Sequence, residues 1–148
     1  MPEERKLATV LFADIVGSTT LAGEHDPERI RAVFQRTFDH MRGVIETHGG
    51  TVEKFIGDEV MAVFGVPTAH DDDAQRAVRC AVAIREATAA FEPAARLQVA
   101  LRIGVNTGEV IASLASGDQN LVTGQAVNAA ARLRAAASPP TRRPPNRR

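Results

Sequence analysis

Two aspartates stand at positions where carboxylates could serve chemistry at phosphorus. Asp14 lies at the end of an apolar run near the N-terminus, and Asp58 follows Gly57 between two apolar stretches. Neighbouring carboxylates repel each other unless cations neutralise them, and two Mg²⁺ or Mn²⁺ ions are the usual clamp for in-line attack at phosphorus. A Gly-Asp dipeptide also forms turns without any catalytic role. The surrounding elements must therefore decide between the two interpretations.

The first half of the chain predicts elements that bring both aspartates together. These are a buried strand over residues 7–16, a helix from Pro27 to Gly49-Gly50, and two strands over 51–56 and 59–64. Gly57-Asp58 joins the last two strands as the tight turn of an antiparallel hairpin. If the first strand lies beside this hairpin, Asp14 and Asp58 point at one spot near the edge of the sheet.

The second half of the chain predicts two more helices and a second hairpin. We expect a helix after the acidic segment 71–73, strands over 97–105 and 109–113 joined by a turn at Asn106-Thr107-Gly108, and an alanine-rich helix over 125–137. This order predicts an α+β fold, a ferredoxin-like or palm-type antiparallel sheet with helices packed on one face. Residues 1–137 form one domain, and the Pro- and Arg-rich segment 138–148 is expected to be disordered.

Two further groups of residues suit phosphate chemistry. Gly17, Ser18 and Thr19 follow the first strand, where the free N–H groups of a helix start can hold phosphate oxygens. The simpler alternative is a Ser/Thr helix cap. Asn128 and Arg132 are four residues apart and share one face of the last helix. The simpler alternative is that this face is only exposed to solvent.

Four segments of the chain together resemble the class III adenylate and guanylate cyclases in order and spacing. They are Phe12-Ala13-Asp14-Ile15-Val16-Gly17-Ser18-Thr19, Glu53-Lys54-Phe55-Ile56-Gly57-Asp58-Glu59, Arg102-Ile103-Gly104-Val105-Asn106-Thr107-Gly108, and Gly124-Gln125-Ala126-Val127-Asn128-Ala129-Ala130-Ala131-Arg132-Leu133. The resemblance extends from about residue 7 to residue 137. It implies the class III cyclase fold and an enzyme of intracellular signalling.

The resemblance also implies a role for each site residue. Asp14, Asp58 and the Ile15 carbonyl would bind two metal ions, while the ribose 3′-oxygen of the substrate attacks the α-phosphorus and releases pyrophosphate. Lys54 matches the position that reads adenine, and a lysine donor suits the N1 acceptor of that base, which favours ATP. Asn128 would orient the nucleotide, and Arg132 would stabilise charge on the phosphates.

Class III sites form between two domains, so the resemblance implies a homodimer. One subunit would supply the metal-binding carboxylates, and the other would supply Lys54, Asn128 and Arg132. Because this chain carries both sets, two equivalent sites are expected.

The chain departs from the family in two places. Leu121 stands where the family has a second purine-reading Asp, Thr or Ser, which weakens the selection of adenine. The strands that follow the last helix in the family, one with a triphosphate-binding lysine, have no counterpart in segment 138–148. Two alternatives therefore stay open: an inactive, truncated cyclase domain that serves as a dimerisation or regulatory module, and a diguanylate cyclase relative suggested by the hairpin around Asp58.

Composition excludes several other classes of protein. The chain has 148 residues with a formal net charge of zero, and four of its eighteen Lys and Arg residues lie in the tail: Arg142, Arg143, Arg147 and Arg148. The remaining body is mildly acidic, which argues against nucleic-acid binding. No apolar stretch reaches the roughly 20 residues of a membrane span. The single cysteine, Cys80, allows no internal disulfide, so a cytoplasmic location is expected.

Overall fold

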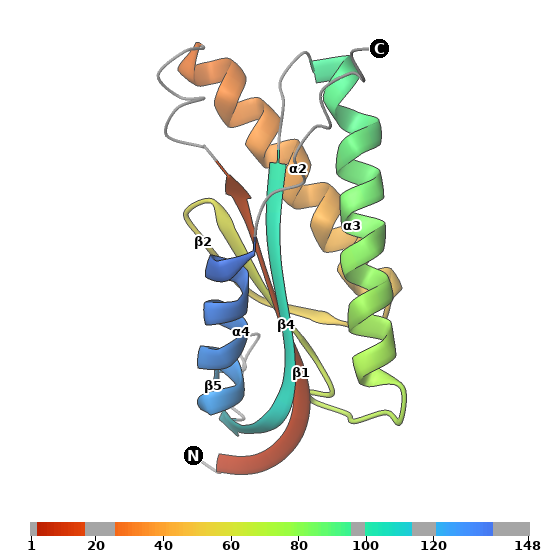
Figure 1. Ribbon diagram of the computed structural model, residues 1–148, viewed down its shortest axis with the longest axis vertical. Helices are drawn as coiled ribbons and strands as arrows, with labels where there is room; N and C mark the ends of the chain where they lie inside the picture. The colour runs from red at the N-terminus through yellow and green to blue at the C-terminus, as the bar shows by residue number, and fades with distance from the viewer. Residues whose placement is uncertain (1–2, 17–25, 96–99, 114–120, 138–148) are drawn as a thin grey trace, which may run out of the picture.

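A five-stranded antiparallel sheet with the order β2-β3-β1-β4-β5 forms the centre of the molecule (Figure 1). The computed structural model describes residues 3–16, 26–95, 100–113 and 121–137. The elements are β1 (Glu3–Val16), α2 (Pro27–Thr47), β2 (Thr51–Ile56), β3 (Glu59–Phe64), α3 (Asp73–Ala95), β4 (Ala100–Ser113), β5 (Leu121–Thr123) and α4 (Gln125–Ala136). The predicted α+β class is confirmed. The predicted hairpin over 51–64 has the expected bounds.

The central strand β1 buries residues on both of its faces, and this divides the core into two layers. Leu11, Ala13 and Ile15 lie in one cluster with residues of α2 and α3. Val10 and Phe12 belong to a second cluster that includes residues of α4. Alternate residues of a strand face opposite sides of the sheet, so α4 covers the face opposite α2 and α3. The expectation that the helices pack on one face is therefore wrong.

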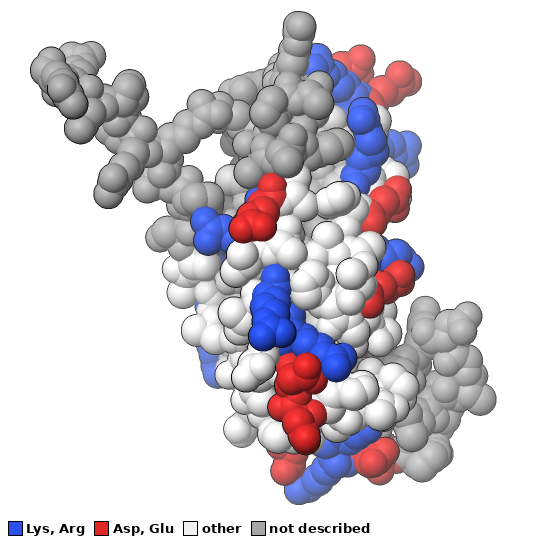
Figure 2. Space-filling view, turned by 90° about the vertical axis from the view of Figure 1, so that its right-hand side faces the viewer, with Lys and Arg blue, Asp and Glu red and all other residues white. Residues whose placement is uncertain are grey.

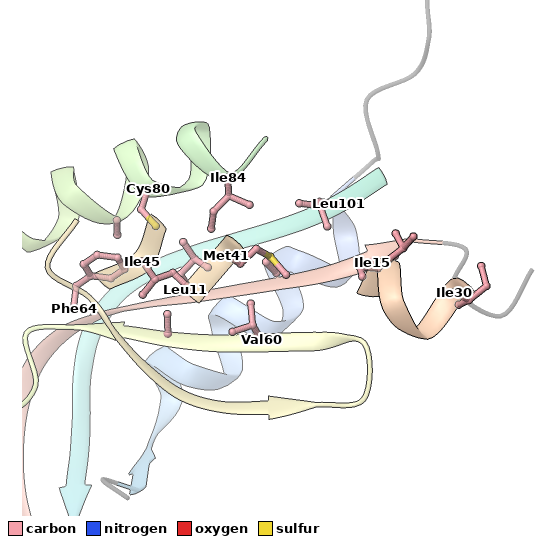
Figure 3. Close-up of a cluster of buried hydrophobic side chains, with 14 residues drawn as sticks. Leu11, Ile15, Ile30, Met41, Ile45, Val60, Phe64, Cys80, Ile84 and Leu101 are labelled. Carbon is pink, nitrogen blue, oxygen red and sulfur yellow. The ribbon is translucent and has the colours of Figure 1, made fainter. Parts of the chain in front are cut away.

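Figure 3 shows how the larger cluster fills the space between the sheet and the helices α2 and α3. Leu11 of β1 and Ile45 of α2 are 0% exposed in this layer. Cys80 and Ile84, four residues apart on α3, point into the same layer. Since i and i+4 positions share one face of a helix, the apolar spacing of the sequence is sufficient to orient α3 on the sheet.

The second predicted hairpin is wrong, because residues 100–113 form the single long strand β4. β4 pairs with β1 without interruption from Val16↔Ala100 to Glu3↔Ser113. The expected turn at Asn106-Thr107-Gly108 lies in the middle of this strand. The Asn106 side chain donates to the Ala126 carbonyl of α4, and a Cβ at Gly108 would lie 3.0 Å from the Cβ of Ala126. Residues of this kind commonly form turns, but in β4 their small or polar side chains allow α4 to pack closely against the strand.

Helix α2 begins with a capped N-terminus at Asp26. The carboxylate of Asp26 accepts a hydrogen bond from the backbone N–H of Glu28 at 3.0 Å, and Pro27 occupies the first helical turn. This bond satisfies one of the N–H groups that a helix start leaves without a partner.

The surface beside α3 carries basic and acidic side chains that are interspersed, without a broad area of one sign (Figure 2). Among the described residues on this face, the basic side chains form no extended stripe of the kind that holds a nucleic-acid backbone.

In the described residues, the helices are too short or too polar to cross a bilayer.

Candidate functional site

Charged side chains from three neighbouring strands form a row across the sheet on the face that α4 covers. Asp14 of β1 pairs with Glu59 of β3 on one side and with Arg102 of β4 on the other. Residues that pair directly across antiparallel strands point to the same face. The row Glu59, Asp14, Arg102 thus lies on the α4-facing side of the sheet, next to the apolar residues of that side.

The carboxylate of Asp14 is buried and strongly hydrogen-bonded. Arg102 donates from Nη2 to Oδ2 at 2.9 Å and from Nε to Oδ1 at 3.2 Å. This two-bond geometry is the strongest form of an Arg–carboxylate pair. The pKa of Arg102 is raised by the hydrogen bond with Asp14, next by the charge of Asp14, and in small part by the charge of Asp58.

Asp58 lies next to this row because the β2–β3 turn folds against the end of β1. The N–H of Ile15 donates to the carbonyl of Asp58 at 3.0 Å. Gly57, before it, has a φ of 58°, a left-handed conformation that glycine adopts without steric cost. The turn residue and the strand residue that the sequence analysis paired are thus brought to one end of the sheet.

The donor atoms at this end of the sheet suit a hard divalent cation. The carboxylates and main-chain carbonyls of Asp14, Ile15 and Asp58 offer oxygen only, which Mg²⁺ and Mn²⁺ prefer. Among the residues that the structure describes, His, Cys, Asp and Glu form no group of three able to hold a metal. A cation here would therefore complete its shell with oxygens of main chain, substrate or water, which is usual for Mg²⁺.

The family model of the adenylate and guanylate cyclase catalytic domain matches residues 1–141. The chain belongs to this family. Over 136 residues it is 33% identical to adenylate cyclase 1 of Rhizobium meliloti (strain 1021). The matching region makes up 87% of this chain and 20% of that protein. The chain thus spans about a fifth of the length of this relative.

Two solved structures in particular resemble the fold. The guanylyl cyclase Cya2 is 33% identical with a TM-score of 0.86, covering 94% of this chain and 74% of that one. The adenylyl cyclase CyaB from P. aeruginosa is 30% identical with a TM-score of 0.87, and the match covers 94% of this chain and 76% of that one. The class III cyclase fold predicted from the sequence is confirmed.

The cyclase residues predicted from the sequence do not all converge within one chain. Lys54 pairs with Met61, so it lies on the same face as Asp14 but two strands away. Its side chain is 42% exposed and contacts the carboxylate of Glu53 at 3.3 Å. Asn128 and Arg132 lie on the exposed side of α4. Gly17, Ser18 and Thr19, predicted to bind phosphate, lie outside the described residues.

Three charged residues of the site were missed by the sequence analysis. Glu59 and Arg102 lie inside the motifs quoted above, and the period of two along a strand would have placed them beside Asp14. Arg134 extends the buried series Ala126 and Ala130 by one more step of four residues. The rule that grouped Asn128 with Arg132 would thus have placed Arg134 on the sheet-facing side of the same helix.

Proposed function

We propose that this cyclase domain is an adenylate cyclase, which converts ATP to 3′,5′-cyclic AMP and pyrophosphate. The observation that carries the proposal is the approach of Asp58 to the end of β1, where the Ile15 N–H meets the Asp58 carbonyl at 3.0 Å beside the buried Asp14. Two carboxylates at one end of a sheet, in a chain of this family, form the expected site for two metal ions.

In the proposed reaction the ribose 3′-oxygen forms a bond to the α-phosphorus, and the bond from that phosphorus to the bridging oxygen breaks. Two Mg²⁺ or Mn²⁺ ions, when bound, would ease loss of the 3′-hydroxyl proton to solvent and neutralise the triphosphate. Asp14 and Asp58 would hold these ions with the Ile15 carbonyl. Arg102, whose side chain is 33% exposed, is a positive group within the same site and suits negatively charged phosphate oxygens.

The choice of ATP rests on Lys54. Its ammonium can only donate hydrogen bonds, and adenine presents an acceptor at N1, where guanine presents a donor. The named relatives include both an adenylate and a guanylyl cyclase, so the identity of this residue supports the assignment more directly than the relatives do.

The proposed active unit is an intracellular homodimer. Asn128 and Arg132 lie on the exposed side of α4, whereas Ala126 and Ala130 of the same helix are buried against the sheet. A second copy of the chain could therefore receive Asn128 and Arg132 at its own carboxylates. Such a two-fold pair would contain two equivalent sites.

Cyclisation by the purified chain tests this proposal. We expect cyclic AMP from ATP with Mn²⁺, little product from GTP, and no product from Asp14→Ala or Arg132→Ala alone. In an equimolar mixture of the two variants, half of the dimers are mixed and each has one intact site, so about a quarter of the parent activity should return. Cyclic GMP as the main product would refute the substrate. No product under any metal would favour the inactive dimerisation module instead.

A further inference from the structure

Arg134 is a charged residue on the side of α4 that packs against the sheet. Ala130 and Ala126, one and two helical turns earlier, are 0% and 4% exposed. The Arg134 side chain is 18% exposed. Long charged side chains in such positions are normally paired. The partners of Arg134 should therefore explain why an arginine stands there.

The partners are the carboxylates of the site. Nη1 of Arg134 lies 3.4 Å from Oδ2 of Asp14 and forms a second ion pair with Oε2 of Glu59. Its guanidinium carbon also lies 5.7 Å above the centre of the Phe12 ring, a cation–π distance. One guanidinium thus bridges two carboxylates that stand side by side on β1 and β3.

The backbone of α4 at Arg134 lies unusually close to strand β4. A Cβ on Gly104 of β4 would lie 2.3 Å from the backbone nitrogen of Arg134. Only a glycine at residue 104 leaves room for the helix backbone this close to the strand. This close approach of α4 to β4 brings the Arg134 guanidinium to within 3.4 Å of the Asp14 carboxylate.

We propose that Arg134 occupies the carboxylate site in place of a metal ion, and that a divalent cation must displace it from Asp14 to bind. Oδ2 of Asp14 accepts from both Arg102 and Arg134, so a cation at this oxygen competes with two guanidinium groups. Arg102 holds the carboxylate through two bonds from the neighbouring strand. Arg134 makes only one, longer contact with Asp14 and is the group that yields there, while its ion pair with Glu59 need not break. The residue thereby sets how much metal the site requires. The inference rests on the proposed function, because it takes Asp14 to be a metal ligand.

Mn²⁺ binding without nucleotide turnover tests this inference. The concentration of free Mn²⁺ is followed by electron paramagnetic resonance in titrations of the parent, Arg134→Gln and Arg134→Lys. We expect Arg134→Gln to bind Mn²⁺ about tenfold more tightly, which corresponds to about 1.4 kcal/mol. Arg134→Lys keeps the positive charge and should stay close to the parent. Arg79→Gln, which removes one exposed arginine from α3 on the opposite face, controls for net charge and should leave the affinity unchanged.

The outcomes separate this inference from the proposed function. Unchanged or weaker Mn²⁺ binding by folded Arg134→Gln overturns the inference, because it would make Arg134 a support for the site and not a competitor. The variant Asp14→Asn tests the metal site itself, and it should bind Mn²⁺ at least tenfold more weakly. If Asp14→Asn leaves the affinity unchanged, Asp14 is not a metal ligand and the proposed function fails with it.

Discussion

Replacing Gly104 by alanine should destabilise the domain, because this residue lets the backbones of β4 and α4 come into contact. The added Cβ would meet the Ala130 carbonyl oxygen at 2.3 Å, the Arg134 nitrogen at 2.3 Å and the Arg134 Cα at 2.9 Å. All three are backbone atoms, so no side-chain rotation relieves the contacts. Real Cβ contacts essentially never fall below 3.0 Å, and the helix must therefore withdraw by at least the difference of 0.7 Å.

The cost of that withdrawal can be compared with known cases of overpacking. Adding a methyl group to a tightly packed core typically costs about 1–3 kcal/mol. With a urea dependence of about 1–3 kcal/mol per molar, the midpoint of denaturation for Gly104→Ala should fall by about 1 M. Because α4 also carries Asn128 and Arg132, cyclase activity should fall as well.

A second glycine supplies the matched control. Gly43 lies on the exposed side of α2, one turn before the helix ends, and a Cβ there would meet nothing within 4 Å. Gly43→Ala should raise the free energy of unfolding by about 0.5–1 kcal/mol, because alanine restricts the unfolded chain and favours the helix. Urea denaturation followed by circular dichroism measures both variants. Equal stability of Gly104→Ala and the parent would refute the close approach of α4.

Three other predictions use different parts of the structure. Burial raises the pKa of Cys80 to about 12 from 9.0, so the thiol stays protonated in the folded state up to about pH 12, whereas in the unfolded state it ionises above pH 9. The free energy of unfolding should therefore fall by up to about 1.4 kcal/mol per pH unit between pH 9 and 12, and Cys80→Ala should lack this part of the fall. If the free energy of unfolding of the parent and of Cys80→Ala fell in parallel over this range, the prediction would be wrong. Asp26→Ala removes the cap of α2 and should cost about 1 kcal/mol in thermal unfolding, whereas Asp26→Asn should cost much less; equal losses would exclude capping as the cause. Lys54→Glu should lower kcat/KM for ATP by about tenfold to a hundredfold relative to that for GTP, since the carboxylate offers adenine N1 no donor; an unchanged ratio would show that Lys54 does not read the base.

Local patterns in the sequence were sufficient for much of the fold. The hairpin over 51–64 follows from two β-branched runs around Gly57-Asp58, and α2 follows from Pro27 and the apolar spacing after it. The motifs also identified the family and placed Asp14 and Asp58 at one end of the sheet. These features depend on neighbours within a few residues, for which the chemistry of each side chain is a direct guide.

Contacts between distant segments decided the rest. Asn106-Thr107-Gly108 has the composition of a turn, but pairing with all of β1 keeps these residues extended, and their small or polar side chains make room for α4. The face that α4 covers, and therefore the meeting of Arg134 with Asp14 and Glu59, depends on packing between elements far apart in the chain. The sequence determined most of the elements and the residues of the family motifs. The tertiary structure alone decided that residues 100–113 form one strand and which charges neutralise one another, because electrostatic partners are chosen by distance in space and not along the chain.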